Sequence, residues 1–170
     1  MNEYKIDGFR FDFTKGMSNT IYTGSNNWAS AYDPSRIAIL KNYADHVWNI
    51  NPTNKPYVIF EHLSDNSEET ELANYGIMLW GNMNQQYNEA TMGYNNDLNW
   101  AVYKQRGWSD PHLVSYMESH DEERLMFKNL EYGNSGSGYN VKDFNTALGR
   151  QELATTFFLT IPGPKMIWLF

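Results

Sequence analysis

The sequence predicts an α/β protein with a parallel β-sheet. Three apolar, β-prone stretches, residues 6–12, 57–61 and 113–116, carry this prediction, and the first two end in a carboxylate. Segments with helical spacing lie between them, and strands that alternate with helices are typical of a parallel sheet. We therefore expect a single domain over residues 1–170, with charged groups at the carboxyl ends of its strands.

Two long helices are predicted from the spacing of apolar residues. Over residues 34–50, the side chains that share one face are Ile37, Leu40, Ala44, Val47 and Trp48. Pro34 suits the first turn of this helix, where a backbone N–H has no partner in any case. Residues 143–160 show similar spacing. In the middle of the chain we expect a further strand at residues 77–80 and a helical stretch at 98–106.

The spacing of three carboxylates agrees with a (β/α)₈ barrel, in which one strand–helix unit takes about 30 residues. Asp12 and Glu61 are 49 residues apart, enough for one unit with a long loop, and Glu61 and Asp121 are 60 apart, enough for two. The chain then holds about five strands, the last in the apolar run 165–170. We expect a partial TIM (β/α)₈ barrel, truncated at its N-terminal side, whose unpaired strand edges favour formation of a homo-oligomer.

Composition excludes several classes of partner and chemistry. A net charge of −7 provides no basic surface for nucleic acid or an anionic membrane. No apolar run approaches the roughly 20 residues that span a bilayer, and the N-terminal residues lack the layout of a signal peptide, so we expect a soluble chain and leave its compartment open. With no cysteine there is no thiolate nucleophile or metal ligand. Aromatic residues make up 16% of the chain and suit sugar rings as well as protein cores.

Asp12, Glu61 and Asp121 are predicted to meet at one end of the sheet, because parallel strands end at the same edge. Retaining glycoside hydrolysis needs a carboxylate nucleophile and a carboxylic acid about 5 to 5.5 Å away from it. Asp12 and Glu61 can supply this pair, and Asp121 can stabilise the positive charge of the transition state. Arg10 lies two residues before Asp12, on the same strand face, and can keep it ionised.

Four short motifs follow one another along the chain: GFRFDFTK at residues 8–15, VIFE at 58–61, SHD at 119–121 and IPGP at 161–164. The first three resemble the strand-four, strand-five and strand-seven motifs of the α-amylase family (glycoside hydrolase family 13), and the fourth resembles the approach to strand eight. This resemblance covers nearly the whole chain. It implies a fragment that spans strands four to eight of the catalytic barrel.

The resemblance implies a hydrolase of α-1,4-glucans such as starch and maltooligosaccharides. In that case Asp12 would be the nucleophile, Glu61 the general acid/base and Asp121 the stabiliser of the transition state. The same resemblance implies that the α-glucan is bound by Arg10, Lys15 and His120. Hydrolysis and transglycosylation pass through the same covalent intermediate, so both remain open.

Two departures from the family pattern limit the expected activity. The strand-three motif, with its catalytic-subsite Asp and His, has no counterpart, so we expect the isolated chain to be weakly active or inactive. Gly16 stands where the family often has His, which removes one side-chain contact with the substrate. Its carbonyl could still help to hold calcium, but the other ligands would belong to segments outside this chain. We therefore expect no cofactor in this chain and consider calcium possible only in a full-length parent protein.

Two other functions stay open. A non-catalytic carbohydrate-binding domain could use the aromatic residues, although it would not need three acids at strand ends. A self-associating half-barrel without activity is the second alternative. A metal hydrolase is disfavoured, because the four histidines show no ligand spacing.

Several further residues are assigned structural roles. We expect His62 to be a hydrogen-bond partner and Glu122 and Glu123 to belong to the acidic start of a helix, since acidic groups stabilise helix N-termini. The residues assigned to the core are Phe9, Phe11, Phe13, Ala154, Phe157, Phe158 and Ile161.

Overall fold

The computed structural model describes residues 3–168 and contains within them a four-stranded parallel sheet. The strands are β1 (Gly8–Phe11), β2 (Tyr57–Phe60), β3 (Met78–Asn82) and β4 (Leu113–Tyr116), and they lie in the order in which they occur in the chain. Each neighbouring pair is parallel. The predicted α/β class and parallel sheet are confirmed.

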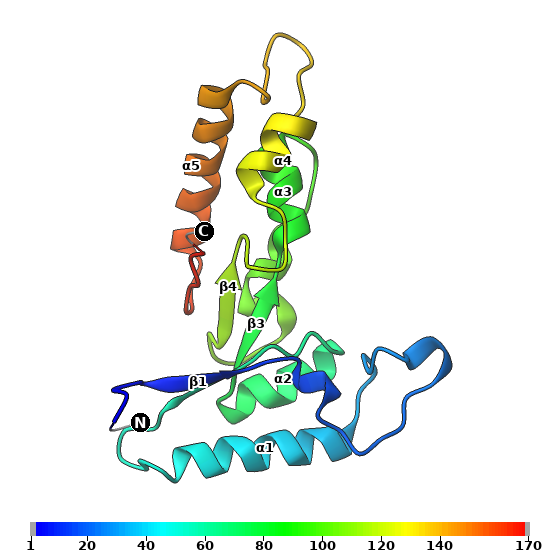
Figure 1. Cartoon of the computed structure of the whole chain (residues 1–170), viewed down its shortest axis with the longest axis vertical. Helices are drawn as coiled ribbons and strands as arrows, with labels where there is room; N and C mark the ends of the chain where they lie inside the picture. The colour runs from blue at the N-terminus through cyan, green and yellow to red at the C-terminus, as the bar shows by residue number, and fades with distance from the viewer. Residues whose placement is uncertain (1–2, 169–170) are drawn as a thin grey trace.

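Five α-helices accompany the strands in residues 3–168: α1 (Pro34–Trp48), α2 (Asn66–Tyr75), α3 (Asn84–Met92), α4 (Leu125–Tyr132) and α5 (Phe144–Thr160). Figure 1 shows α1 and α2 beside β1 in the lower part of the molecule, and α3, α4 and α5 upright in the upper part, with β3 and β4 between the two. Within the described part of the chain, no helix combines the length and the hydrophobicity needed to cross a lipid bilayer.

The two long helices begin where their sequences predict. Asp33 caps α1 by accepting hydrogen bonds from the N–H groups of Ser35 and Arg36, and Asp143 caps α5 by accepting one from that of Thr146. Each bond satisfies a donor that has no partner within the helix. The predicted apolar face of α1 is buried, with Trp48 partly so.

Described helices cover one face of the sheet; the other, called the open face here, has no helix on it, although its residues Trp80 and Val114 are themselves buried. Alternate strand residues Val58 and Phe60 point toward α1 and α2 and belong to the main core. Ile59 points the other way and packs against Trp80 and Val114. No described helix covers this second face, which borders an apolar cavity of about 580 Å³.

The predicted helix at residues 98–106 is wrong. Two 3₁₀ turns, η3 (Asn99–Ala101) and η4 (Tyr103–Arg106), flank Val102, which is extended. The Arg106 side chain donates to the Trp100 carbonyl over 2.8 Å, an acceptor that a continuous α-helix would use for a backbone N–H. Its guanidinium also stacks on Trp108, so side-chain packing stabilises the broken form.

The fifth predicted strand, at residues 165–170, is represented by a single parallel bridge between Ser115 and Lys165. The Ser115 N–H donates to the Pro164 carbonyl, and the Met166 N–H donates to the Ser115 carbonyl. Residues 169–170 lie outside the described part of the chain. The segment therefore lies beside β4 without forming a regular ladder within the described residues.

Two of the seven residues assigned to the core are exposed, which corrects that prediction. Phe13 is 47% exposed because it adopts a left-handed conformation (φ 45°) and leaves the alternation of β1. Phe157 is 40% exposed on α5, while its neighbour Phe158 is buried. Phe9 and Phe11 pack, partly buried, against the main core.

Candidate active site

The ends of β1 and β2 place Asp12 and Glu61 next to each other. Each residue directly follows its strand, and the two strands are parallel and in register up to Phe11 and Phe60. The pairing continues past the strands: the Glu61 N–H donates to the Phe11 carbonyl, and the Thr14 N–H donates to the Glu61 carbonyl over 2.8 Å. The backbone therefore holds the two carboxylates at one edge of the sheet.

Arg10 joins these two carboxylates directly. Its Nη1 lies 2.5 Å from Oδ1 of Asp12, and its Nη2 lies 2.8 Å from Oε2 of Glu61. The guanidinium also stacks on the ring of Trp80, 4.1 Å from its centroid. Because a guanidinium presents its donors in a fixed plane, this stacking fixes the direction of both ion pairs. The predicted alignment of Arg10 with Asp12 is confirmed.

Asp12 is held in its ionised form. The hydrogen bond from Arg10 is the largest of the effects that lower its pKa, and the charge of Arg10 adds to it. The Asp12 side chain is 75% exposed and can be reached from solvent. An accessible, charged carboxylate is what a nucleophile requires.

Glu61 lies in a different environment from Asp12. Its side chain is only 14% exposed, and its Oε2 accepts hydrogen bonds from Arg10 and from the backbone N–H of Phe13, the latter over 3.1 Å. The left-handed conformation of Phe13 belongs to the tight turn that carries this N–H. The two neighbouring carboxyl groups therefore differ in exposure and in their hydrogen-bond donors.

His120 and Asp121 lie in the loop after β4, on the same aromatic cluster as Arg10. The His120 ring is 6.1 Å from the ring of Trp80, and its Nε2 lies 3.3 Å from Oδ1 of Asp121. Burial raises the pKa of Tyr116, and the charges of Glu122, Glu61 and Asp121 raise it further. Among the described residues, no hydrogen bond or ion pair joins Asp121 to Asp12 or Glu61. The structure therefore brings Asp121 to this end of the sheet without direct contact with Asp12 or Glu61.

Acidic residues shape this loop differently from the prediction. Helix α4 begins at Leu125, so Glu122 and Glu123 precede it. Glu122 instead accepts two hydrogen bonds from Ser119, from the backbone N–H over 2.9 Å and from the hydroxyl. Glu118 accepts the Leu125 N–H over 2.8 Å and so serves the start of α4. These bonds fix the turn that carries His120 and Asp121.

Lys15 lies apart from the Arg10 bridge. Its Nζ is 3.3 Å from the carbonyl oxygen of Leu63 and 3.4 Å from the hydroxyl of Ser30. The lysine therefore connects the loops that follow β1 and β2. A role in substrate binding for Lys15 stays a prediction.

Gly16 packs closely against Phe13. A Cβ atom at this position would lie 2.9 Å from the ring of Phe13, so a histidine would require this exposed ring to move. The Gly16 carbonyl accepts the N–H of Ser18 over 3.0 Å. Within residues 3–168 no group of three or more His, Asp or Glu side chains is arranged to hold a metal ion. We assign no step to calcium.

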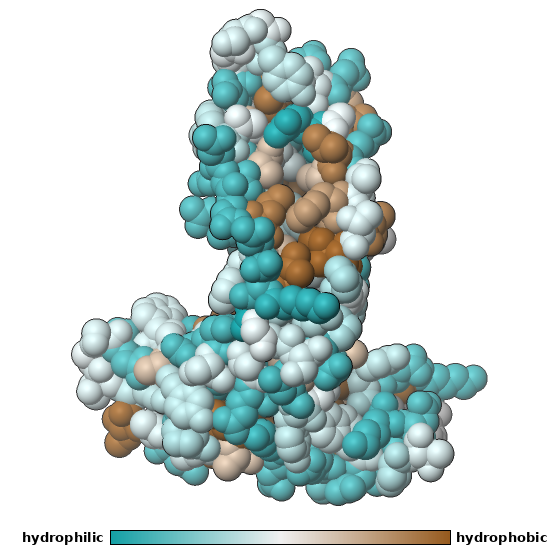
Figure 2. Space-filling model, turned by 180° about the vertical axis from the view of Figure 1, so that it is seen from behind, coloured by the Kyte–Doolittle hydropathy of each residue, from teal (hydrophilic) through white to brown (hydrophobic). Residues whose placement is uncertain are grey.

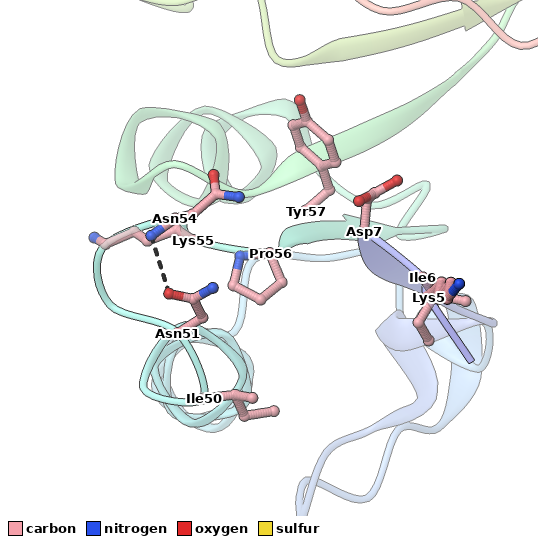
Figure 3. A pocket seen from close by; sticks show the side chains of 9 residues that line it. All are labelled: Lys5, Ile6, Asp7, Ile50, Asn51, Asn54, Lys55, Pro56 and Tyr57. Carbon is pink, nitrogen blue, oxygen red and sulfur yellow. Dashed lines mark hydrogen bonds between the residues drawn. The ribbon is translucent and has the colours of Figure 1, made fainter. Parts of the chain in front are cut away.

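A hollow of about 1290 Å³ lies at the opposite end of the strands. Figure 3 shows it between the start of β1 and the segment that leads from α1 into β2, where Asp7, Lys55 and Tyr57 line it. Asp7 is the only carboxylate in this lining, so the hollow offers no acid–nucleophile pair. The smaller cavity on the open face of the sheet adjoins the candidate site, because Arg10 and His120 line it.

Sequence reasoning missed several residues that support the site. Trp80 belongs to no recognised motif, although it lies in the strand next to the one that Glu61 follows, and that position could have identified it. Nothing in the sequence around Glu68, on α2, indicated a role in the site. The expectation that His62 is a hydrogen-bond partner is confirmed, since its two ring nitrogens lie 3.0 Å from Thr14 Oγ1 and 2.8 Å from Glu68 Oε1.

No protein-family model matches this sequence, and no curated protein matches it either. The chemistry open to the site is therefore inferred from its residues. They are an exposed, ionised carboxylate, an enclosed carboxyl group on the same guanidinium, and a neighbouring His–Asp pair.

Proposed function

We propose that this chain carries the catalytic carboxylates of a retaining glycoside hydrolase that acts on α-1,4-linked glucans. The observation that carries the proposal is the shared guanidinium of Arg10, which holds Asp12 and Glu61 together at the ends of neighbouring parallel strands. In the first step Asp12 attacks the anomeric carbon while Glu61 protonates the leaving oxygen. In the second, Glu61 takes a proton from water, which attacks the glycosyl–Asp12 ester and releases the sugar with retained configuration.

The unequal surroundings of the two carboxyl groups support this division of roles. Asp12 is exposed and its pKa is lowered, mainly by Arg10, so it is available as a nucleophile. Glu61 is enclosed and fixed by two donors, which suits a group that must meet one leaving oxygen. Asp121, next to His120, could stabilise positive charge that develops on the sugar ring.

The substrate class rests on the likeness of the motifs at residues 8–15, 58–61 and 119–121 to those of the α-amylase family. The same likeness leads us to interpret the sheet as part of a (β/α)₈ barrel. Three features support this: the strands are parallel and follow chain order, α1 and α2 lie against one face, and the other face is apolar and open. In a closed barrel that second face would be the packed interior.

The open face also leads us to propose self-association. Within the described residues β1 pairs only with β2, so its other edge is free, and Ile59, Trp80 and Val114 border the uncovered cavity. Figure 2 shows further apolar side chains gathered on the upper part of the molecule, and α5 exposes Leu153 and Phe157. A second copy could cover such surfaces. Concentration-dependent mass in light scattering is expected, and a monodisperse monomer would count against it.

The open face favours a second candidate, a self-associating half-barrel that binds glucan without turning it over. Transition-state stabilisation depends on donors around the whole sugar ring, and the strand-three motif that would supply two of the contacts has no counterpart in the sequence. We therefore expect activity to be weak in the isolated chain. Binding of maltooligosaccharide without turnover would support this second candidate.

The deciding experiment compares the chain with its Asp12→Asn variant on a chromogenic α-maltooligosaccharide. Turnover that the substitution abolishes would support the glycosidase. An activated fluoroglycoside, which slows the second step, should also label Asp12, and mass spectrometry would detect the ester even when turnover is slow. Absence of both turnover and label in the folded chain would refute catalysis by the isolated chain.

A further inference from the structure

A buried chain of polar side chains lies directly beneath the two carboxylates. It runs from Thr14, after β1, through His62, after β2, to Glu68 on α2 and Arg36 on α1, and each of these side chains is at most 1% exposed. Thr14 Oγ1 lies 3.0 Å from His62 Nδ1, and His62 Nε2 lies 2.8 Å from Glu68 Oε1. Arg36 Nε and Nη2 donate to Glu68 over 2.6 and 2.8 Å.

Thr14 connects this chain to Glu61. The Thr14 N–H donates to the Glu61 carbonyl over 2.8 Å, and the Thr14 hydroxyl lies 3.1 Å from the same oxygen. Thr14 also directly follows Phe13, whose N–H donates to the Glu61 carboxylate. Thr14 therefore contacts the backbone of Glu61 directly and is connected to its carboxylate through the neighbouring residue Phe13.

The hydroxyl of Thr14 has one proton and two acceptors within reach, so the state of His62 decides where that proton goes. Burial lowers the pKa of His62, against the opposing effect of Glu68, and the ring is neutral at neutral pH. Burial would raise the pKa of Glu68, but hydrogen bonds from His62 and Arg36 outweigh it, so this carboxylate is ionised. Nε2–H of His62 therefore donates to Glu68, and its Nδ1 accepts the Thr14 hydroxyl.

We infer that His62 is a positioning residue for Glu61, which it orients by accepting the Thr14 hydroxyl while Glu68 and Arg36 hold its ring in place. This role rests on the proposed function, because it concerns the aim of the acid/base. A packing role alone would need no acceptor at Nδ1. Arg36 anchors the network further by donating to the carbonyls of Lys15 and Ala29, in the segment that follows β1.

Two substitutions at His62 separate positioning from packing. In His62→Asn, Oδ1 takes the place of Nδ1, so the acceptor for Thr14 is kept and the donor to Glu68 is lost. In His62→Gln, Nε2 keeps the donor and the acceptor is lost. Thr14→Ser and Thr14→Val form a second pair, which keeps or removes the hydroxyl and remains informative if a His62 variant does not fold.

The measured quantities are kcat and KM on the chromogenic maltooligosaccharide, the Tm, and the ¹³C chemical shift of the Glu61 carboxyl in each variant. We expect His62→Gln and Thr14→Val to lower kcat by about tenfold to a hundredfold with little change in KM, since a small misplacement of a catalytic group is costly. Their Glu61 signals should shift. His62→Asn and Thr14→Ser should stay close to the unsubstituted chain in both readouts.

The chemical shift separates failure of this role from failure of the proposed function. A chain without turnover whose Glu61 signal moves in His62→Gln and Thr14→Val, but not in their partners, retains the positioning role and loses the glycosidase. Equal effects within each pair, or losses that follow Tm alone, would overturn the positioning role whatever the activity.

Discussion

Arg10 and Glu61 face each other across the ends of β1 and β2, with 2.8 Å between Nη2 of the arginine and Oε2 of the glutamate. Nη1, the other terminal nitrogen of Arg10, forms an ion pair with Oδ1 of Asp12. One cation thus serves both carboxylates of the candidate site, while Trp80 supports its other side. This relationship makes the site sensitive to the shape of the cation as well as to its charge.

Arg10→Lys should therefore impair the site although the charge is kept. An ammonium cannot form the planar fork that reaches Asp12 and Glu61 together. We expect kcat/KM to fall by about a hundredfold or more, because both catalytic groups lose their orientation. The pKa of Asp12 should rise toward its usual value, which moves the acidic limb of the pH–activity profile upward. Arg150→Lys on α5 is the control, and equal losses in both variants would contradict a special role for Arg10.

Glu69 should make the protein less stable as pH rises. Burial raises the pKa of this carboxyl group from 4.5 to about 7, against the opposing charge of Arg106. The folded protein then binds the proton more tightly than the unfolded chain, so the free energy of unfolding falls between about pH 4.5 and 7. Glu69→Gln should remove up to about 3 kcal/mol of this dependence.

Urea unfolding at pH 5 and pH 8 measures that effect. Glu71→Gln is the matched control, because Glu71 is partly exposed and its pKa is lowered, mainly by Lys41, which gives a weak dependence of opposite sign. A Glu69→Gln variant with the pH dependence of the unsubstituted chain would show that Arg106 keeps Glu69 ionised throughout.

Arg36→Met should be strongly destabilising. The substitution leaves Glu68 buried without its main counter-ion and the carbonyls of Ala29 and Ala31 without a donor. Loss of one partner of a buried ion pair costs about 3 to 5 kcal/mol. Lys41→Met, which breaks an ion pair at the surface, should cost less than about 1 kcal/mol. Similar urea midpoints for the two variants would contradict this ranking.

Gly8→Ala should destabilise the pairing of β1 with β2. A Cβ atom at Gly8 would lie 2.3 Å from the carbonyl oxygen of Tyr57, its partner in the register, and backbone cannot easily yield. We expect a loss of about 1 to 3 kcal/mol. Gly149→Ala is the contrasting variant, since nothing lies within 4 Å of that position in α5. It should raise stability by about 0.5 to 1 kcal/mol, and a fall in Tm would contradict this.

Local patterns were sufficient for the strands and the two long helices. Residues 57–60 and 113–116 are short runs of apolar, β-prone residues, and α1 begins at Pro34 after the Asp33 cap. The incorrect predictions lie where side-chain packing outweighs the preference of the backbone. The stretch at residues 98–106 breaks because Arg106 packs between Trp100 and Trp108. Helix α3, whose sequence is rich in amide side chains, was not expected.

The residues of the candidate site likewise fall into those that the sequence could identify and those that only the structure could. Asp12, Glu61 and Arg10 could be identified because each lies in or directly after a strand, and the period of a strand fixes which side chains share a face. His62, Glu68 and Arg36 act together only because α1 and α2 pack against the same face of the sheet. Their contacts join residues 32 and 6 positions apart, on two helices and the loop after β2, and no local sequence pattern indicates them.

The sequence by itself determined the parallel α/β class, the ends of the strands and the carboxylates that follow them, because strand period and turn chemistry act over a few residues. Only the tertiary structure decided that Arg10 serves both Asp12 and Glu61, that Phe13 leaves the core to direct its N–H at Glu61, and that a buried network lies beneath them. The physical reason is distance. Hydrogen bonds and ion pairs depend on separations of about 3 Å between groups that the chain order alone leaves unplaced.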